Sequence, residues 1–258
     1  INYVIWSDVF DCPNCGSEIV FWENGVDQEG GIVLENMTCP SCGSENTKSN
    51  CENTFETHYD DVLGISIKQK KMVPVLISYV YKGKKLLKKP DSYDLELFET
   101  ARKETSNIKS VVPNYRMMFG QESRRNDKYG ITHLHHFYFE KNLIALQKYY
   151  EYCDDPILIG ILTTVAFRIN KRYSLTYQAG TWGAGGGPTS GTLYIPSLIK
   201  DLNILPMLKQ ALKKRLDVDN SEFIKPCIGT GSFSKLIIHN ESVDYIFLDP
   251  PFGSNLNY

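Results

Sequence analysis

Four consecutive residues near the end of the chain, Asp249-Pro250-Pro251-Phe252, combine a carboxylate, a rigid backbone corner and an aromatic ring. They follow the apolar run Tyr245–Leu248, which has the composition of a buried strand. Ligands of open α/β sheets bind beyond the carboxyl ends of the strands, so we expect Asp249 to face a substrate crevice. Because the prolines fix the backbone and donate no hydrogen bond, the Pro250 carbonyl is free to accept one, and the pair of acceptors suits a planar amine. The alternative is a strand-ending turn without chemistry, since Asp and Pro are common turn residues.

Together with the lead-in Ser242–Asp244 and an expected strand at Phe223–Cys227, this motif resembles the catalytic region of the DNA amino-methyltransferases. These enzymes transfer a methyl group from S-adenosylmethionine to adenine N6 or cytosine N4. The resemblance implies that the Asp249 carboxylate and the Pro250 carbonyl accept the two amine protons, which is catalysis by positioning and electrostatics. It also implies that Pro251 stiffens the corner and that Phe252 stacks on a base flipped out of the duplex. Adenine is favoured, because the cytosine-N4 members more often carry Ser at the position of Asp249.

A cofactor cradle in this family requires a strand, a glycine-rich turn and a helix in that order, and neither glycine-rich segment fits. Gly229–Ser232 lies only about twenty residues before Asp249, fewer than the roughly 30 of a βαβ unit, so we expect an interstrand turn. Gly180–Pro188 follows an expected helix, which favours a mobile surface loop over a flap that closes on substrate. We therefore assign no cofactor-binding residue. Since the chain begins with Ile1 and ends just past the motif, we expect an inactive piece of a longer enzyme.

Two nearly identical knuckles, Cys12-Pro13-Asn14-Cys15-Gly16 and Cys39-Pro40-Ser41-Cys42-Gly43, lie near the start. Each C-x-x-C directs two thiolates at one ion, and together they predict a structural tetrahedral Zn²⁺ site with Cys12, Cys15, Cys39 and Cys42 as ligands. Strand-like Glu18–Trp22 and Ile32–Leu34 lie between the knuckles, so we expect a zinc ribbon over residues 1–60. Disulfides and a redox-active pair are the alternatives, and the duplicated knuckle argues against both. The cysteines Cys51, Cys153 and Cys227 are left unassigned.

The remaining residues, 61–258, predict a mixed α/β region that ends in the catalytic turn and is an incomplete catalytic domain. The pattern predicts a strand at Val73–Tyr81 followed by a hairpin turn at Lys82–Lys84. Apolar spacing and end residues predict helices at Asp94–Asn107, His136–Tyr152, Asp154–Arg172 and Asn203–Leu216. The expected fold class is α+β or α/β: a partial Rossmann-like methyltransferase sheet with helices, plus the N-terminal zinc ribbon.

Two further groups of polar residues could bind ligands. Basic residues cluster in the middle of the chain, and these could contact phosphates or form a solvated surface: Lys68, Lys70, Lys71, Lys82, Lys84, Lys85, Lys88, Lys89, Arg124 and Arg125. The histidines His133, His135 and His136 could bind a metal. Their spacing lacks the i, i+4 pair of one helix face, which favours structural histidines.

With 42% hydrophobic residues and a net charge of −2, the chain is globular and is not as a whole an electrostatic nucleic-acid binder. No apolar run approaches a membrane span, so we expect a cytoplasmic protein that does not contact a membrane. The predicted function is part of a site-specific, S-adenosylmethionine-dependent DNA methyltransferase of the restriction-modification kind, with DNA as partner and zinc bound.

Two alternatives remain. One is methylation of RNA or of a protein amide, whose motifs usually begin with Asn. The other is a zinc-ribbon module that binds nucleic acid or protein without catalysis. A parallel strand before Asp249, beside Phe223–Cys227, favours the enzyme, whereas C-terminal residues that are disordered or antiparallel favour the module.

Overall fold

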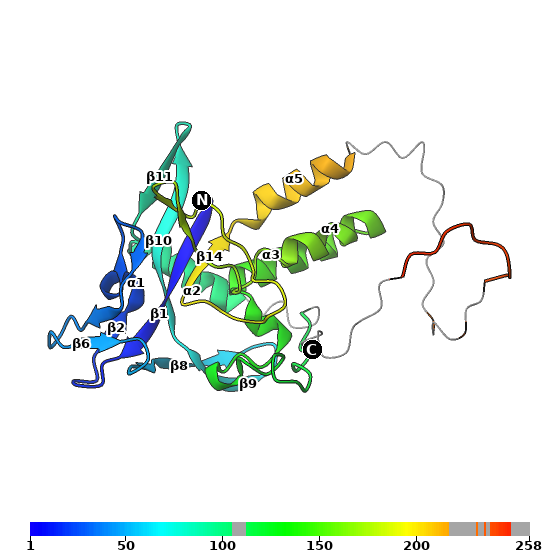
Figure 1. Ribbon diagram of the computed structural model, residues 1–258. Helices are drawn as coiled ribbons and strands as arrows, with labels where there is room; N and C mark the ends of the chain where they lie inside the picture. The colour runs from blue at the N-terminus through cyan, green and yellow to red at the C-terminus, as the bar shows by residue number, and fades with distance from the viewer. Residues whose placement is uncertain (105–111, 217–230, 232–234, 236–237, 249–258) are drawn as a thin grey trace.

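The computed structural model describes residues 1–104, 112–216, 231, 235 and 238–248 (Figure 1). Its strands are β1 (Tyr3–Asp11), β2 (Glu18–Val20), β3 (Val26–Asp27), β4 (Ile32–Val33), β5 (Asn36–Thr38), β6 (Glu45–Thr47), β7 (Glu52–Asn53), β8 (Phe55–Asp60), β9 (Ile65–Lys70), β10 (Met72–Tyr81), β11 (Lys84–Lys88), β12 (Tyr177–Gln178), β13 (Thr181–Trp182) and β14 (Leu198–Leu202). Its helices are α1 (Phe21–Asn24), α2 (Ser92–Glu104), α3 (Glu140–Glu151), α4 (Pro156–Ala166) and α5 (Ile204–Leu216), with the 3₁₀ turns η2 (Asp127–Tyr129) and η3 (Leu134–Phe137). The expected strand Phe223–Cys227 and the motif Asp249–Phe252 lie outside the described residues.

A six-stranded sheet organises the fold around β1, in the order β11-β10-β1-β14, with β2 and β7 pairing with the far end of β1. All of these pairings are antiparallel. The register of β1 against β10 shifts between Ile5 and Trp6, opposite Pro74, a residue that cannot donate to the ladder. The mixed α and β class is therefore confirmed, whereas no Rossmann-like parallel sheet is present among the described residues.

Both faces of β1 are buried, because its side chains alternate between two cores. Tyr3 and Ile5 enter a core with Trp22 and Trp182. Val4 and Trp6 enter the opposite core, where the Trp6 ring stacks on Phe139 with centroids 4.4 Å apart. Although it lies within residues 1–60, β1 thus joins the predicted zinc-ribbon region to the rest of the molecule.

The predicted hairpin and helices lie close to their expected positions, with differences at their ends. The turn between β10 and β11 has Lys82 and Gly83 at φ of 48° and 75°, as a tight two-residue hairpin requires. The helix expected to begin at His136 begins at Glu140, because η3 and the extended Tyr138 precede it. The helix expected to reach Arg172 ends at Ala166. In Figure 1, α4 and α5 lie side by side beyond the edge strand β14.

Within the glycine-rich segment Gly180–Pro188, Trp182 and Gly183 are buried against the central strand, whereas Gly180, Gly185 and Gly186 are exposed. The segment is therefore a surface loop only in part. Gly180 forms the turn of the β12–β13 hairpin. At Gly183, φ is +78° and an added Cβ would lie 2.6 Å from the Tyr3 hydroxyl, which itself donates to the Trp182 carbonyl at 3.0 Å. Only glycine permits so close an approach.

The apolar run Tyr245–Leu248 is not a strand in the structure, contrary to the sequence prediction. A strand needs a neighbour for its backbone hydrogen bonds, and no described residue pairs with this run. The four side chains are 57–80% exposed. Residues 238–248 lie away from the sheet and helices (Figure 1).

Candidate metal centre

The two cysteine knuckles have the same backbone geometry. Cys12 N–H donates to Ser17 O and Cys39 N–H to Ser44 O, both at 2.9 Å. The glycines that close the knuckles donate back to the first cysteine of each, and their φ angles are 72° at Gly16 and 70° at Gly43. These left-handed positions confirm the tight turns predicted from the glycines. The first knuckle follows β1 and the second connects β5 to β6.

The knuckles bring their four sulfur atoms to one point. The Sγ atoms of Cys12, Cys15, Cys39 and Cys42 all lie within 4.8 Å of one another. Cys12 Sγ lies 3.8 Å from Cys42 Sγ, and Cys15 Sγ lies 3.6 Å from Cys39 Sγ. Tetrahedral zinc with Zn–S bonds of about 2.3 Å requires sulfurs about 3.8 Å apart, whereas a disulfide requires about 2.05 Å. The cysteines are free thiols, and they fit one tetrahedral ion.

Neighbouring groups favour the thiolate forms of Cys12 and Cys42. At Cys39 the backbone N–H of Cys42 acts to lower the pKa, but burial and the adjacent thiols of Cys15 and Cys12 raise it to about 11. Hydrogen bonds from Asn14 and Ser44 lower the pKa of Cys42 to about 5. The Ser44 hydroxyl also lowers the pKa of Cys12. Asn46, which is buried, directs its Nδ2 at Cys12 Sγ over 3.9 Å. Such partners around a metal site orient the ligands and tune their basicity.

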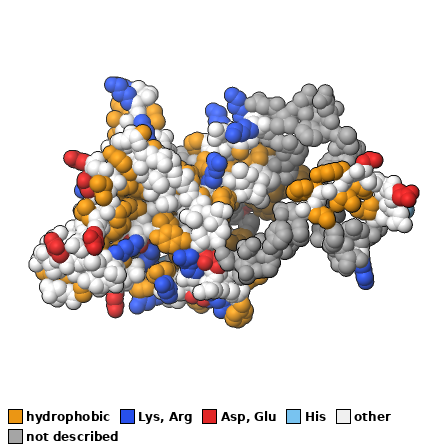
Figure 2. Space-filling model, in the orientation of Figure 1, with side chains coloured by type: hydrophobic (Ala, Val, Ile, Leu, Met, Phe, Trp, Pro, Cys, Tyr) orange, Lys and Arg blue, Asp and Glu red, His pale blue; other side chains and the backbone are white. Residues whose placement is uncertain are grey.

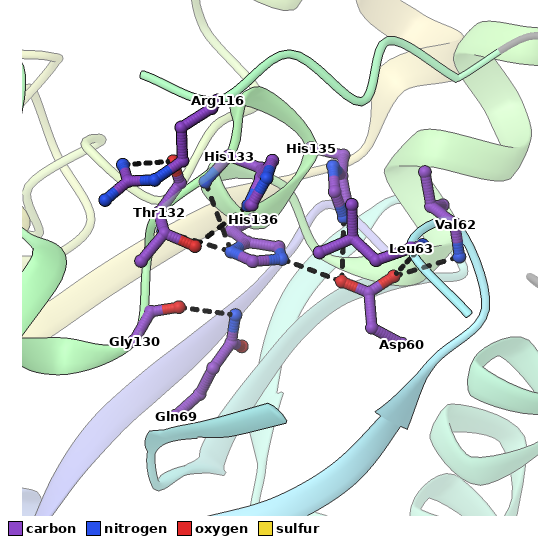
Figure 3. Close-up of polar contacts among 10 residues, drawn as sticks. All are labelled: Asp60, Val62, Leu63, Gln69, Arg116, Gly130, Thr132, His133, His135 and His136. Atoms are coloured by element: carbon purple, nitrogen blue, oxygen red, sulfur yellow. Dashed lines mark hydrogen bonds and ion pairs between the residues drawn. The ribbon is translucent and has the colours of Figure 1, made fainter. Parts of the chain in front are cut away.

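A second group of potential ligands comes from β8 and η3 (Figure 3). The side chains of Asp60, His135 and His136 are all buried, and their ligand atoms lie within 4.8 Å of one another. Asp60 Oδ2 accepts hydrogen bonds from His135 Nε2 at 2.9 Å and from His136 Nε2 at 2.8 Å. Asp60 Oδ1 accepts the backbone N–H groups of Val62 and Leu63.

The tautomer of His136 shows why proximity does not make this group a metal centre. His136 Nδ1 accepts the backbone N–H of Thr132 at 3.1 Å and that of His133 at 3.4 Å. Nδ1 therefore carries no proton, so Nε2 of the neutral ring carries it and cannot offer a lone pair to a metal. Asp60 already accepts four hydrogen bonds. This network supports the prediction of structural histidines and fastens η3 to the β8–β9 hairpin.

Burial and hydrogen bonding set the charges in the Asp60 network. Burial would raise the pKa of Asp60, but the hydrogen bonds from His135, His136 and Leu63 hold it well below its usual range. Burial lowers the pKa of His136 to about 4, against the opposing effect of its hydrogen bond to Asp60. An ionised Asp60 facing a neutral His136 is the stable state at neutral pH.

Ion pairs neutralise part of the predicted basic cluster, while other members remain at the surface. Lys70 pairs with Asp8 at 2.8 Å with both side chains buried, and the other ion pairs lie nearer solvent: Lys71–Glu18, Lys88–Asp91, Lys88–Asp94, Lys89–Glu23 and Arg125–Glu122. Arg124 lies over the Phe119 ring at 3.8 Å. Lys82, Lys84 and Lys85 are exposed at the tip of the β10–β11 hairpin, where Figure 2 shows basic side chains.

Sequence analysis missed the acidic partners of these groups. Asp60 lies 75 residues before His135 in the sequence, and Asp8 lies 62 residues before Lys70. Only the fold brings each pair together. Asp8 lies within the apolar stretch of β1, where a charged residue could have suggested a buried partner. Nothing in the sequence around Asp60 distinguishes it from Asp61.

No protein-family model, no curated protein and no solved structure matches this chain. Among the described residues, no helix combines the length and the apolar character needed to cross a membrane.

Proposed function

We propose that this chain is part of an S-adenosylmethionine-dependent DNA methyltransferase that methylates the exocyclic amine of a flipped base, adenine N6 more readily than cytosine N4. The observation that carries this proposal is the sequence Asp249-Pro250-Pro251-Phe252 directly after an apolar run. An exocyclic amine is a poor nucleophile because its lone pair is delocalised into the ring. Two acceptors that bind both amine protons localise the lone pair and direct it at the methyl group.

The exposed run Tyr245–Leu248 would need strand partners outside the described residues to form the sheet that this proposal requires. Four consecutive apolar side chains that are 57–80% exposed represent surface whose burial is favourable. In the proposed enzyme, this run is a sheet strand that places Asp249 at the carboxyl edge. Among the described residues, no strand leads through a glycine-rich turn into a helix, so this proposal places the cofactor cradle outside them.

The four-cysteine cluster has a structural role in this proposal. We infer that Cys12, Cys15, Cys39 and Cys42 bind one Zn²⁺, because their number, spacing and sulfur separations fit a closed tetrahedral site. A closed site leaves no open coordination position for a substrate, so zinc takes no part in methyl transfer.

Methyl transfer by the natural protein that contains these residues tests the proposal. Radiolabelled S-adenosylmethionine and duplex DNA are the substrates, and Asp249→Ala is expected to lower transfer by at least about a hundredfold, the effect of losing a positioned acceptor. Asp244→Ala, which changes a carboxylate before the strand, is the matched control. Transfer that survives Asp249→Ala undiminished would exclude the catalytic role.

A zinc-containing module that binds nucleic acid without catalysis is the second candidate. The observation in its favour is that Tyr245–Leu248, directly before the motif, form no parallel strand, while the described sheet is antiparallel in all its pairings. The two candidates differ in cofactor binding: the intact enzyme binds S-adenosylmethionine, whereas the module does not. Calorimetry on the 258-residue chain adds a further test, because micromolar affinity there would place the cradle within these residues.

A further inference from the structure

A pocket between six parts of the chain gathers more positive than negative charge. The pocket has a volume of about 220 Å³, and we call it the basic pocket. Its walls come from β1, the segment after β6, β7, the end of β9, the segment around η2 and the segment that precedes β14. Its charged and aromatic lining residues are Asp8, Phe10, Lys48, Lys70, Arg125, Lys128, Tyr129 and Tyr194.

The floor of the basic pocket is electrically neutral, and its rim is positive. Lys70 and Asp8 are 5% and 2% exposed and neutralise each other. Arg125 pairs with Glu122, a residue outside the lining. Lys48 and Lys128 make no ion pair with any described residue, so the rim carries two uncompensated ammonium groups.

Desolvation makes the Lys48 ammonium receptive to an anion. Lys48 donates a hydrogen bond to the Ser197 hydroxyl and lies 5.1 Å from the Phe21 ring centroid. Although the Lys48 residue as a whole is exposed, desolvation of its ammonium group lowers its pKa, and Asp8 only partly opposes this effect. An anion that approaches Lys48 would supply the missing partner and would favour its charged form.

The basic pocket is held in shape by contacts on each side of η2. Asn126 Nδ2 donates to the Leu193 carbonyl at 2.8 Å, and Gln69 Nε2 donates to the Gly130 carbonyl at 3.2 Å. Gly130 lies so close to β9 that an added Cβ would be 2.0 Å from the Lys68 carbonyl oxygen. Lys128 and Lys70 both lie within 5.0 Å of the Tyr129 ring centroid. The cations are therefore presented by a fixed surface.

We propose that the basic pocket binds a backbone phosphate of DNA through Lys48, Lys128 and Arg125. This inference rests on the proposed function, which makes DNA the partner, and it assigns the contact to particular residues. Phosphate matches the rim because its oxygens accept from several ammonium and guanidinium donors at once. Phosphate contacts of this kind position the duplex without selecting its sequence. Lys48 directly follows β6, the strand that comes after the second cysteine knuckle.

Equilibrium binding of a fluorescein-labelled duplex over a series of salt concentrations tests this proposal. Lys128→Ala is the main variant, because Lys128 is exposed and its removal leaves the packing of the pocket intact. Affinity is expected to fall about fivefold, and the slope of log K against log salt is expected to decrease by about 0.9 for the lost contact. Lys48→Ala is expected to act in the same way and to add to the effect. Lys84→Ala, an exposed lysine at the β10–β11 tip, is the matched control.

Two outcomes would overturn the proposal. The first is that the double variant Lys48→Ala/Lys128→Ala binds the duplex with the same affinity and the same salt slope as the control variant. The thermal unfolding midpoints of the two variants must also agree, which shows that both are folded. The second is that the double variant loses binding to inorganic phosphate or a mononucleotide while its duplex binding is unchanged, which would make the basic pocket a small-anion site.

Methyl-transfer assays separate this test from that of the proposed function. If the pocket variants bind the duplex normally and Asp249→Ala abolishes methyl transfer, only the pocket proposal is excluded. If the pocket variants bind the duplex more weakly and Asp249→Ala retains full methyl transfer, only the proposed function is excluded.

Discussion

Two clusters of potential metal ligands in this molecule differ in what their ligand atoms already do. In the cysteine cluster, the four sulfurs lie close to one another, and the donors around Cys12 and Cys42 favour their thiolates. In the Asp60 cluster, each oxygen accepts two hydrogen bonds, and the His136 nitrogens are fixed as one donor and one acceptor. In both clusters the ligand atoms lie within 4.8 Å of one another. The comparison teaches that available lone pairs, more than proximity, decide whether a cluster can bind an ion.

The prediction with the largest expected effect concerns metal binding by the cysteine cluster. Cys39→Ser is expected to abolish binding of one zinc per chain and to unfold the region around the knuckles, because structural zinc supplies about 10–16 kcal/mol to small sites. Elemental analysis of the purified protein and thermal unfolding with and without a chelator measure this effect. Cys51→Ser is the control, since Cys51 is buried but lies outside the cluster. Zinc content unchanged in Cys39→Ser would contradict the assignment.

The next largest effect concerns Asp60. Asp60→Asn is expected to destabilise the fold by about 3–5 kcal/mol. The new amide NH₂ group would face an N–H donor of Asp60's present partners, and the buried hydrogen bonds from the histidines to the carboxylate would be lost. Denaturant unfolding measures the change, with Glu35→Gln, an exposed carboxylate, as control. Zinc content is expected to stay at the wild-type value. A drop by one zinc per chain would show instead that the histidines bind metal.

The pH dependence of stability tests the protonation state of His136. Its pKa is lowered from 6.5 to about 4 by burial, so below pH 6.5 the unfolded chain binds a proton that the folded chain does not. Stability is therefore complete above pH 6.5 and decreases as the pH falls towards about 4. The loss down to about pH 5 is expected to be about 2 kcal/mol, since each pH unit corresponds to about 1.4 kcal/mol.

His136→Gln provides the comparison for this pH effect. Denaturant unfolding across the same pH range, in zinc-saturated buffer, is expected to show a slope smaller by about one proton in the variant. The half-buried His58 and His133 also have pKa values lowered by desolvation, so the variant retains part of the dependence. Identical slopes in the two proteins would mean that His136 is protonated in the folded state.

The difference between the clusters also explains what the sequence could predict. The cysteine knuckles are local, since each C-x-x-C-G fixes its own turn, and the β10–β11 hairpin is equally local. The partner of the histidines is set by the fold, because Asp60 reaches His135 only when η3 packs on the β8–β9 hairpin. Gly183 likewise fits under Tyr3 only through a contact that long-range folding creates. The central place of β1 depends on pairing with β10 and β14, which periodicity alone does not specify.

The smallest effect separates the cysteine ligands from the residues that surround them. Asn14 Nδ2 donates to Cys42 Sγ at 3.4 Å and is the main cause of the lowered pKa of Cys42. Asn14→Ala is expected to weaken zinc binding about tenfold without releasing the metal at neutral pH, because partners of metal ligands tune affinity within about 10–100-fold. Competition with a chromophoric chelator measures the affinity, and Ser41→Ala, in the second knuckle, is the matched control. Since Asn14 contacts nothing in the Asp60 network, His136→Gln should reduce the pH slope of stability by the same amount in the Asn14→Ala background as in the wild type. A different reduction would mean that the two clusters are coupled through β1.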